Sequence, residues 1–200
     1  MAQSARRIGL LGGSFDPVHR AHLALAEAAR EAFALDEVRL MPCAQQALKT
    51  RRASPADARC AMLRLALAAH PHLTLDLREC HPAGPVYTVD TLRALRAAEP
   101  NADFWFILGM DSVCSFPKWH RPEELLTLCH FIAFDRPGIA PPAPPFSPKL
   151  LAHRLRGPHL DLSSTDLRAA LAAGERLPSA LPPAILPYLR ANPGLYAPMP

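Results

Sequence analysis

The sequence predicts an α/β fold in which a central parallel sheet carries helices on both faces. Short apolar runs alternate along the chain with longer segments of helical period, which is the pattern of repeated βα units. The chain has 200 residues and 50% of them are apolar, so it can bury a full core. A single domain over residues 1–200 is therefore expected.

Each element follows from this alternation, taken in chain order. The short apolar runs predict strands at Ile8–Leu11, Glu37–Met41, Leu73–Leu77, Phe104–Leu108, Phe131–Phe134 and His159–Leu162. The segments of helical period predict helices at Ala21–Phe33, Pro55–Ala69, Val89–Ala98, Pro122–Leu128, Thr165–Ala173 and Pro183–Arg190. Helices between successive strands act as crossover connections, which parallel pairing needs.

The segment 136–148 is expected to be a surface connection because it is rich in proline. It contains Pro137, Pro141, Pro142, Pro144, Pro145 and Pro148, and proline lacks the N–H group that helix interiors and central strands use. Two interpretations are open. One is a stiff spacer between two α/β units, the usual role of proline-rich runs; the other is a mobile lid or interaction segment.

Composition and charge bear on several functional classes. Charge interrupts every apolar stretch well before the roughly 20 residues that span a bilayer. No long apolar segment precedes the first strand, so no signal peptide is expected and the cytoplasm is the expected location. The formal charge is +4, with arginines scattered among acids. This does not indicate a nucleic-acid surface, but a local pocket for small polyanions is compatible with it.

The cysteines are expected to be reduced and mostly buried. There are five, at positions 43, 60, 80, 114 and 129, and none forms a C-x-x-C pair. The alternative is a zinc site, which needs ligand pairs roughly two to four residues apart, and this sequence does not supply them.

A strand, a glycine bend and a helix start follow one another near the beginning of the chain. Ile8-Gly-Leu-Leu precedes Gly12-Gly-Ser-Phe-Asp-Pro-Val-His-Arg-Ala-His22. Gly12 and Gly13 are expected to allow backbone conformations that a Cβ forbids, and to let a phosphate approach main-chain N–H groups. The run is neither a Walker A loop nor the G-x-G-x-x-G fingerprint. A different phosphate chemistry is therefore predicted.

His19 and His22 are three residues apart, which predicts that they share one face of the first helical turn. The helix dipole and the N–H groups there favour anions. A bound polyphosphate would favour protonated imidazoles, so the pair can hold charge that builds on a reacting phosphoryl group. The alternatives are a metal-binding pair or two surface histidines.

A second anion site is predicted at Leu162-Ser-Ser-Thr-Asp-Leu-Arg168. Ser163 or Ser164 can cap the helix that follows, and Arg168 lies about one turn further on, facing back toward the helix start. Hydroxyls, N–H groups and a guanidinium then converge on one point. An ordinary capped helix is the alternative.

Two further segments carry candidate ligand contacts. Leu108-Gly-Met-Asp111 ends a buried strand, where open α/β sheets bind ligands, and Asp111 can accept hydrogen bonds from ribose hydroxyls. Trp119 offers a flat face to an aromatic cation, although packing is the more common role of Trp. Thr88, in Tyr87-Thr-Val-Asp-Thr91, is the expected N-cap of a helix whose amides can bind a carboxylate, unless it is only a cap.

The run Gly12 to His22 resembles the signature of the adenylyltransferase superfamily with an H-x-G-H or T-x-G-H element. Because the first position of this element is a histidine, the element resembles that of nicotinate-nucleotide adenylyltransferases in particular. Ser163–Arg168 resembles the family's S-S-T-x-x-R element, and Gly109–Trp119 resembles its G-x-D…W element. The family's Gly between the histidines is Ala21 here, which adds a methyl group beside the phosphates. The likeness extends from Gly12 to Arg168 in the family's order.

The resemblance implies a Rossmann-like three-layer α/β/α nucleotidyltransferase and assigns residues to roles. The catalytic residues are His19, His22 and Arg168. The ATP-binding residues are Gly12, Gly13, Ser14, Phe15, Lys49, Ser164 and Thr165, although the family has P-H-K where this chain has Gln46-Ala-Leu-Lys49. The substrate-binding residues are Asp16, Thr88, Gly109, Asp111, Trp119 and His120, with the region of Thr88 and Trp119 recognising the nicotinate carboxyl group.

The implied reaction joins ATP and nicotinate mononucleotide into nicotinate adenine dinucleotide and pyrophosphate. Mg²⁺ is the implied cofactor, held mostly by ATP oxygens and water rather than by protein ligands. The alternatives are a phosphopantetheine or nicotinamide mononucleotide acceptor, a cytidylyltransferase, or a nucleotide-binding sensor without turnover. No nucleic-acid or membrane partner is expected, and a homo-oligomer is possible.

Overall fold

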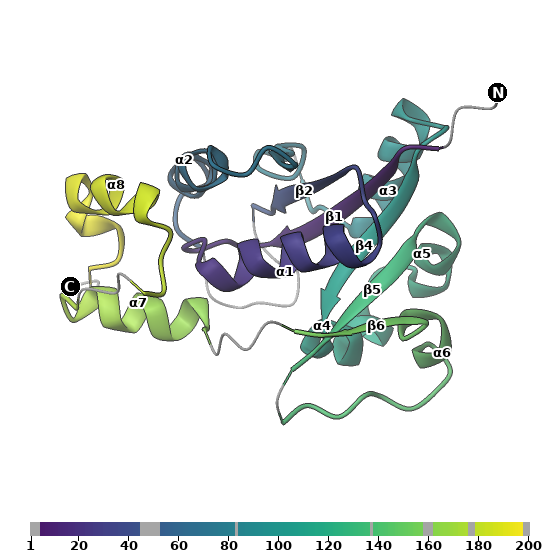
Figure 1. Ribbon diagram of the computed structural model, residues 1–200. Helices are drawn as coiled ribbons and strands as arrows, with labels where there is room; N and C mark the ends of the chain where they lie inside the picture. Colours follow the sequence, from purple (N-terminus) through teal and green to yellow (C-terminus); the bar gives the residue numbers. More distant parts are fainter. Residues whose placement is uncertain are drawn as a thin grey trace.

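One six-stranded, wholly parallel sheet forms the centre of the computed structural model, which describes residues 5–44, 53–82, 84–136, 138–157, 162–175 and 179–197. The strands are β1 (Arg7–Gly13), β2 (Glu37–Pro42), β3 (Leu73–Leu75), β4 (Asp103–Gly109), β5 (His130–Asp135) and β6 (His153–Arg156). Their order in the sheet is β3-β2-β1-β4-β5-β6 (Figure 1). The predicted α/β fold is confirmed, and the order is that of a doubly wound, Rossmann-like sheet.

Helices cover both faces of the sheet (Figure 1). On one face, α1 (Arg20–Ala32) and α2 (Ala56–Leu67) contribute to a core cluster that also includes residues of α7 (Ser164–Ala172) and η2 (Pro183–Ile185). On the other face, α3 (Thr88–Ala98), α4 (Met110–Ser115), α5 (Pro122–Leu128) and α6 (Ser147–Leu150) contribute to a second cluster. The remaining elements are η1 (Phe116–Lys118), α8 (Leu186–Ala191) and η3 (Pro193–Leu195).

The alternation of side chains along each central strand explains the two clusters. In β4, Trp105 and Ile107 belong to the α1 side, whereas Phe104, Phe106 and Leu108 belong to the α3 side. A strand buried on both faces therefore has a continuous apolar sequence. This is why five of the predicted strands could be located from apolar runs alone.

Most of the last predicted strand lies outside the described residues. Residues 159–161 of the His159–Leu162 run are not described, and Leu162 is irregular. The sixth strand is β6, whose residues alternate between half-buried and exposed at the edge of the sheet. An edge strand with His and Arg at three of its four positions has no apolar run, so the sequence did not predict it.

The proline-rich segment joins two strands of the same sheet. Its described residues 138–146 are irregular and lead from β5 to α6 and then β6, which pairs in parallel with β5 (Figure 1). The segment is therefore a mostly exposed surface connection, as predicted, and its role as a spacer or a lid stays a prediction. Pro148 lies in the first turn of the short helix α6, where proline is tolerated because the N–H group there has no helical partner.

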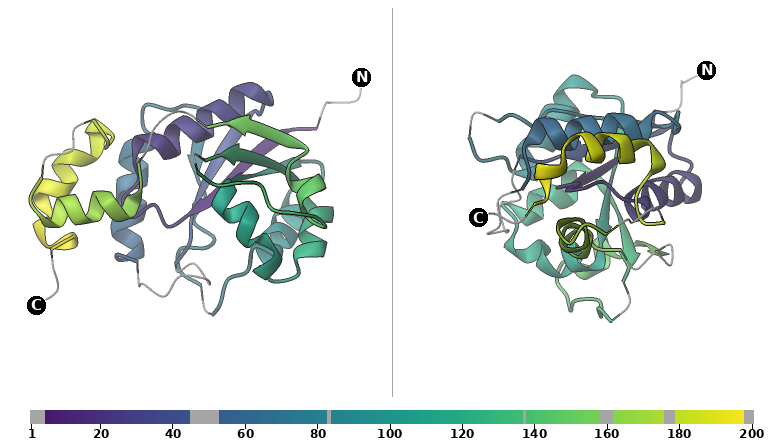
Figure 2. Two further views of the ribbon diagram at one scale, coloured as in Figure 1. Left: turned by 90° about the horizontal axis from the view of Figure 1, so that it is seen from below. Right: turned by 90° about the vertical axis from the view of Figure 1, so that its left-hand side faces the viewer.

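The described part of the C-terminal region packs against the carboxyl end of β1. The α7 and α8 segments gather at the end of the molecule far from the N-terminus (Figure 2, left). The Arg20 backbone N–H donates to Ala180 O (3.0 Å), and its side-chain Nε donates to Leu181 O (3.3 Å). These bonds join the start of α1 to the chain just before η2.

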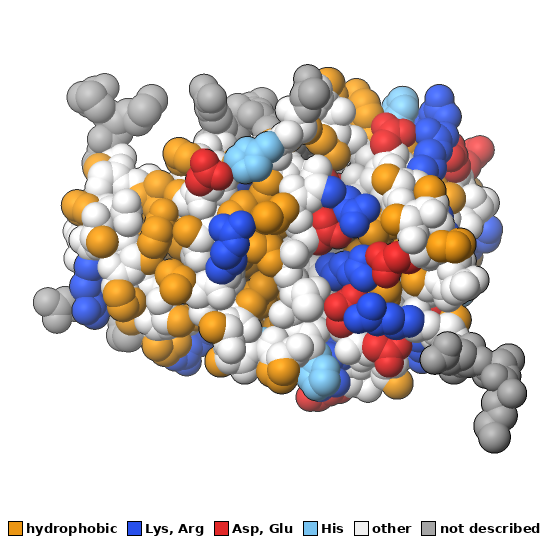
Figure 3. Space-filling model, turned by 90° about the horizontal axis from the view of Figure 1, so that it is seen from above, with side chains coloured by type: hydrophobic (Ala, Val, Ile, Leu, Met, Phe, Trp, Pro, Cys, Tyr) orange, Lys and Arg blue, Asp and Glu red, His pale blue; other side chains and the backbone are white. Residues whose placement is uncertain are grey.

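Charged side chains on the face shown in Figure 3 are interleaved rather than gathered into a basic patch. Among the described residues, Arg39 forms ion pairs with both Glu37 and Glu99. In the described ranges, no helix combines the length and the apolar character that a membrane span requires.

Gly9 provides a test of the central packing. A Cβ built at Gly9 would lie 2.8 Å from Val38 Cγ2 and 2.9 Å from Leu35 Cδ1, both in the core. We expect Gly9→Ala to lower the free energy of unfolding by about 1–3 kcal/mol through overpacking. Gly194→Ala is the matched control because nothing lies within 4 Å of its built Cβ. Equal urea midpoints for the two variants would contradict this packing.

Candidate active site

A cleft of about 1750 Å³ opens at the carboxyl ends of β1 and β4. The chain leaves β1 toward α1 on one face and leaves β4 toward α4 on the other, so the cleft occupies the switch point where open α/β sheets bind ligands. Its volume exceeds the roughly 300–1,000 Å³ of a site for one small molecule. Two ligands of nucleotide size are therefore compatible with it.

The first βα turn, residues 12–19, forms one wall of this cleft. Gly12 and Gly13 are extended residues of β1, and neither has a positive φ. The expectation that their conformational freedom shapes the turn was wrong. The left-handed residue is the buried Phe15 (φ 48°), and a Cβ at Gly13 would lie 3.2 Å from its ring. Gly13 thus makes room for the ring of Phe15.

The two histidines stand together at the start of α1, as the sequence predicted. His19 is the N-cap residue and His22 is the third residue of the helix. Their rings stack with centroids 3.7 Å apart and planes 23° apart. His22 Nδ1 accepts a hydrogen bond from the His19 backbone N–H (3.3 Å), and Phe15 packs edge-on against the His22 ring at 4.9 Å. These contacts hold both imidazoles at the cleft.

The ring of His19 is buried in the wall of the cleft, where it is 4% exposed. Burial lowers its pKa from 6.5 to about 4, and the positive charge of Arg136 adds to this shift. His19 is therefore neutral at pH 7. Within the described residues, its Nδ1 atom has no hydrogen-bond partner. A buried polar atom in this state favours a ligand that supplies the missing bond.

The start of α7 lies directly beside the first βα turn. Ser163 caps the helix by accepting from Asp166 N (3.1 Å), and Ser164 Oγ donates to Pro17 O (3.3 Å). Arg168 Nη1 donates to Asp16 O (2.7 Å), while Nη2 donates to Thr165 Oγ1 (3.1 Å). The predicted second anion site and the histidine pair thus line one cleft.

Asp16 is buried at the base of this arrangement, with an exposed fraction of 1%. Its Oδ1 accepts from the Tyr196 hydroxyl (3.0 Å) and its Oδ2 accepts from Ser54 N (3.1 Å). The sequence assigned Asp16 to the substrate. In the structure, its carboxylate holds two other segments of the chain.

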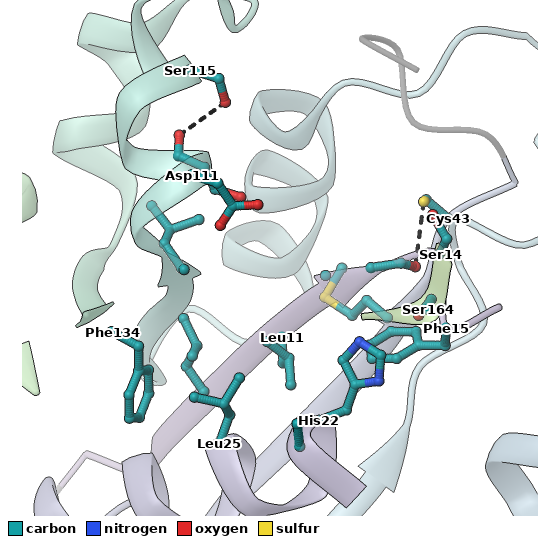
Figure 4. Close-up of a pocket in the computed structure, with 18 of the residues that line it drawn as sticks. Leu11, Ser14, Phe15, His22, Leu25, Cys43, Asp111, Ser115, Phe134 and Ser164 are labelled. Atoms are coloured by element: carbon teal, nitrogen blue, oxygen red, sulfur yellow. Dashed lines mark hydrogen bonds between the residues drawn. The ribbon is translucent and has the colours of Figure 1, made fainter. Parts of the chain in front are cut away.

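The opposite wall carries the predicted substrate residues. Gly109 caps α4, and a Cβ there would lie 2.7 Å from Asp111 Oδ1. Asp111 is exposed to the cleft, across from His22 and Ser164 (Figure 4). Its carboxylate lies 3.6 Å from Arg136 Nη1. Glycine thus leaves space for the Asp111 carboxylate.

Aromatic side chains line the rest of this wall. The half-buried Trp119 packs on Phe116 at 5.4 Å and edge-on to Phe106 at 6.0 Å. His120 lies against the Tyr87 ring at 4.3 Å. All but Phe116 also line the cleft. The wall therefore offers flat faces at the end remote from α7.

One assigned residue differs from expectation and another cannot be compared. Thr88 lines the cleft but is the first residue of α3; the N-cap is Tyr87, with no side-chain capping bond. Tyr87 is extended, and its carbonyl accepts from Asp90 N (3.0 Å), so the helix starts one residue earlier than predicted. Lys49 lies outside the described residues.

The sequence did not indicate Arg59, which binds the backbone of three segments that meet beneath the cleft. Its guanidinium is fully buried. It donates to the carbonyl oxygens of Ser14 (2.7 Å), Cys43 (2.7 Å), Ala44 (3.3 Å) and Ser54 (2.9 Å). An arginine in an amphipathic helix normally faces solvent, so no local signal marks this one.

Three of the five cysteines are buried, as predicted. Cys60, Cys80 and Cys129 are buried, Cys43 is half-buried and Cys114 is exposed. Over the described ranges, no three His, Cys, Asp or Glu side chains are grouped so as to hold a metal ion.

Comparisons with known proteins agree with this geometry. The chain matches the model of the cytidylyltransferase-like family over residues 10–170. It is 42% identical over 204 residues to a Chromobacterium violaceum protein, covering 92% of this chain and 96% of that protein. It is 39% identical over 189 residues to a Herpetosiphon aurantiacus protein, again covering 92% and 96%. Both relatives are named "Probable nicotinate-nucleotide adenylyltransferase".

A solved structure has a similar fold at low sequence identity. It is Plasmodium falciparum nicotinic acid mononucleotide adenylyltransferase complexed with NaAD. The TM-score is 0.76 at 21% identity, over 96% of this chain and 97% of that one.

The buried His19 predicts a specific loss of stability in acid. The unfolded chain binds a proton at His19 below about pH 6.5, whereas the folded chain does so only near pH 4. The free energy of unfolding therefore falls as the pH drops through this window. We expect urea titrations at pH 7 and 4.5 to show a loss about 2–3 kcal/mol larger in wild type than in His19→Gln.

His72→Gln is the control because this histidine is exposed. It should keep the acid sensitivity of wild type. The same loss in His19→Gln as in wild type would show that His19 does not stay neutral in the folded state.

Proposed function

The chain belongs to the cytidylyltransferase-like family and, within it, to the nicotinate-nucleotide adenylyltransferases, and we propose that its cleft transfers the AMP moiety of ATP to nicotinate mononucleotide. It is a nucleotidyltransferase of NAD biosynthesis. The observation that carries the proposal is the convergence of the stacked histidine pair and the Ser164–Arg168 helix start on one cleft. Two anion sites side by side suit a triphosphate that is cut between its α- and β-phosphates.

The reaction needs alignment and charge stabilisation more than a base. An oxygen of the acceptor's 5′-phosphate attacks the α-phosphorus of ATP, and the bond from that phosphorus to the bridging oxygen breaks. Pyrophosphate leaves with the electron pair. Because the nucleophile is already an anion, the protein must hold two repelling phosphates in line and stabilise the charge on the five-coordinate phosphorus.

The two sides of the phosphate site divide this work. His19 and His22 donate to the α-phosphate, and Nδ1 of His19, which has no hydrogen-bond partner in the described part of the chain, gains a phosphate oxygen. The polyanion raises the proton affinity of the imidazoles, which opposes the effect of burial on the pKa of His19. Arg168, Thr165, Ser164 and the α7 amides bind the leaving pyrophosphate, while Gly12, Gly13, Ser14 and Phe15 form the wall along the nucleotide.

The aromatic wall binds the acceptor. Trp119 stacks on the pyridinium ring, an attraction of about 0.5–2 kcal/mol, with His120 at its edge. Asp111, beside Gly109, accepts hydrogen bonds from ribose hydroxyls. The amides at the start of α3, near Thr88, receive the carboxylate that distinguishes nicotinate from nicotinamide. Lys49 is proposed to reach the phosphates.

Mg²⁺ fits this site as a companion of ATP rather than as an ion in a protein cage. The described residues offer no group of three protein ligands, whereas Mg²⁺ commonly binds through substrate phosphates and water. Bound in that way, it neutralises charge on the triphosphate. A single domain, a cytoplasmic location and a possible homo-oligomer stay predictions.

A substrate panel tests the reaction. The protein is incubated with ATP or CTP and with nicotinate mononucleotide, nicotinamide mononucleotide or phosphopantetheine, and products are identified by mass. We expect pyrophosphate and nicotinate adenine dinucleotide as the preferred products. Preference for another acceptor would show that the chain catalyses a different nucleotidyl transfer from the one proposed. Calorimetric binding of ATP without any product would favour a nucleotide sensor instead.

His22 should matter for turnover more than for affinity. Because it stabilises charge that develops during the reaction, we expect His22→Ala to lower kcat by about 100-fold or more and to change the KM values much less. The exposed His72 provides the control His72→Ala, which should match wild type. A loss in kcat below about threefold, only ~0.7 kcal/mol of barrier, would refute the assigned role.

A further inference from the structure

Four segments distant in the sequence meet around Asp16. The Tyr196 hydroxyl donates to Oδ1 across a separation of 180 residues, and Ser54 N donates to Oδ2. The Asp16 carbonyl accepts from Arg168 Nη1 at 2.7 Å. The next residue, Pro17, accepts from Ser164 Oγ. The first βα turn is thus tied to both the start of α7 and the segment after η3.

We propose that Tyr196 is a positioning residue for the ATP-phosphate site, because its hydroxyl fixes Asp16 and Asp16 fixes the guanidinium of Arg168 relative to the histidine pair. This inference deepens the proposed function and rests on it. Tyr196 does not itself touch the reacting phosphates. Its effect passes through the Asp16 carboxylate to the Asp16 backbone carbonyl, which accepts a hydrogen bond from Arg168.

Burial makes this contact stronger than an exposed hydrogen bond. Asp16 is 1% exposed, and a buried carboxylate needs donors to replace water. Burial and the nearby Asp16 carboxylate raise the pKa of Tyr196, so its hydroxyl stays protonated and donates throughout the physiological range. The Ser54 amide supplies the second donor.

The arrangement matters because the two anion sites come from opposite ends of the chain. His19 and His22 follow β1, whereas Ser164, Thr165 and Arg168 follow β6. Their relative placement sets the distance between the groups on the α-phosphate and those on the pyrophosphate. In-line transfer is sensitive to shifts of about 1 Å. If Asp16 were not held in place, binding of ATP would therefore weaken, whereas the aromatic wall that binds the acceptor would be unchanged.

Tyr196→Phe tests the proposal by removing one oxygen atom. We expect the KM for ATP to rise about tenfold, the lower end of the factor for one hydrogen bond to a charged group, with kcat reduced. The KM for nicotinate mononucleotide should stay within twofold. Tyr188→Phe is the matched control, because this tyrosine lies on α8 and packs against the core cluster on the α1 face. It should leave both KM values unchanged.

Asp16→Asn provides the second variant. The amide keeps the size of the side chain but presents an NH₂ group to one of the two donors, so the same selective rise in the KM for ATP is expected. If Tyr196 acts through Asp16, adding Tyr196→Phe to Asp16→Asn should change the KM for ATP by less than twofold. Fully multiplicative effects would overturn the proposed path.

A purely structural role gives a different result. Tyr196→Phe would then lower the melting temperature and the active fraction but leave the KM for ATP unchanged, which would also overturn the proposal. Failure of the proposed function is distinguishable, because wild type itself would give no product. The positioning role of Tyr196 is then tested by calorimetry with ATP alone. Tyr196→Phe should raise the Kd for ATP about tenfold, and an unchanged Kd refutes the role.

Discussion

The site depends on one buried cation at the carboxyl end of the sheet. Arg59 donates to carbonyl groups from the first βα turn, from the chain after β2 and from the chain before α2. Four carbonyl dipoles replace the water that the guanidinium loses on burial, and in return the cation satisfies oxygens that no secondary structure would bond. Arg59 thus fixes Ser54, whose backbone N–H donates to Asp16. It also fixes Ser14, which lies in the same turn as the histidines.

The two walls of the cleft differ in the kind of ligand group that they suit. The α1 and α7 starts present N–H groups, hydroxyls, imidazoles and a guanidinium, which suit phosphate oxygens. The α3 and η1 side presents Trp119, Tyr87 and His120, which suit a ring. Because His22 packs against the buried Phe15 and His19 is itself buried, the charge of a phosphate would act on both rings through a medium of low dielectric constant. For His19, burial thus explains both the lowered pKa and the proposed response to ligand charge.

Much of this fold could be predicted from the sequence because it depends on local patterns of residues. Runs such as Phe131–Phe134 are continuous and apolar, so the central strands could be located, and the His19–His22 spacing fixed their shared face. Other features have no local pattern. The edge strand β6 has the sequence His-Arg-Leu-Arg, and the shape of the first turn comes from Phe15 rather than from the glycines beside it. Arg59 and Tyr196 act through partners up to 45 and 180 positions away.

The long separation between Asp16 and Tyr196 also sets an order of events during synthesis. A ribosome adds about 5–20 residues per second, so the histidine turn emerges roughly 10–40 s before the tyrosine that secures it. Over that interval the sheet can assemble from β1 to β6, but the hydrogen bond between Tyr196 and Asp16 cannot form. This contact is therefore made late, after the whole sheet has been synthesised.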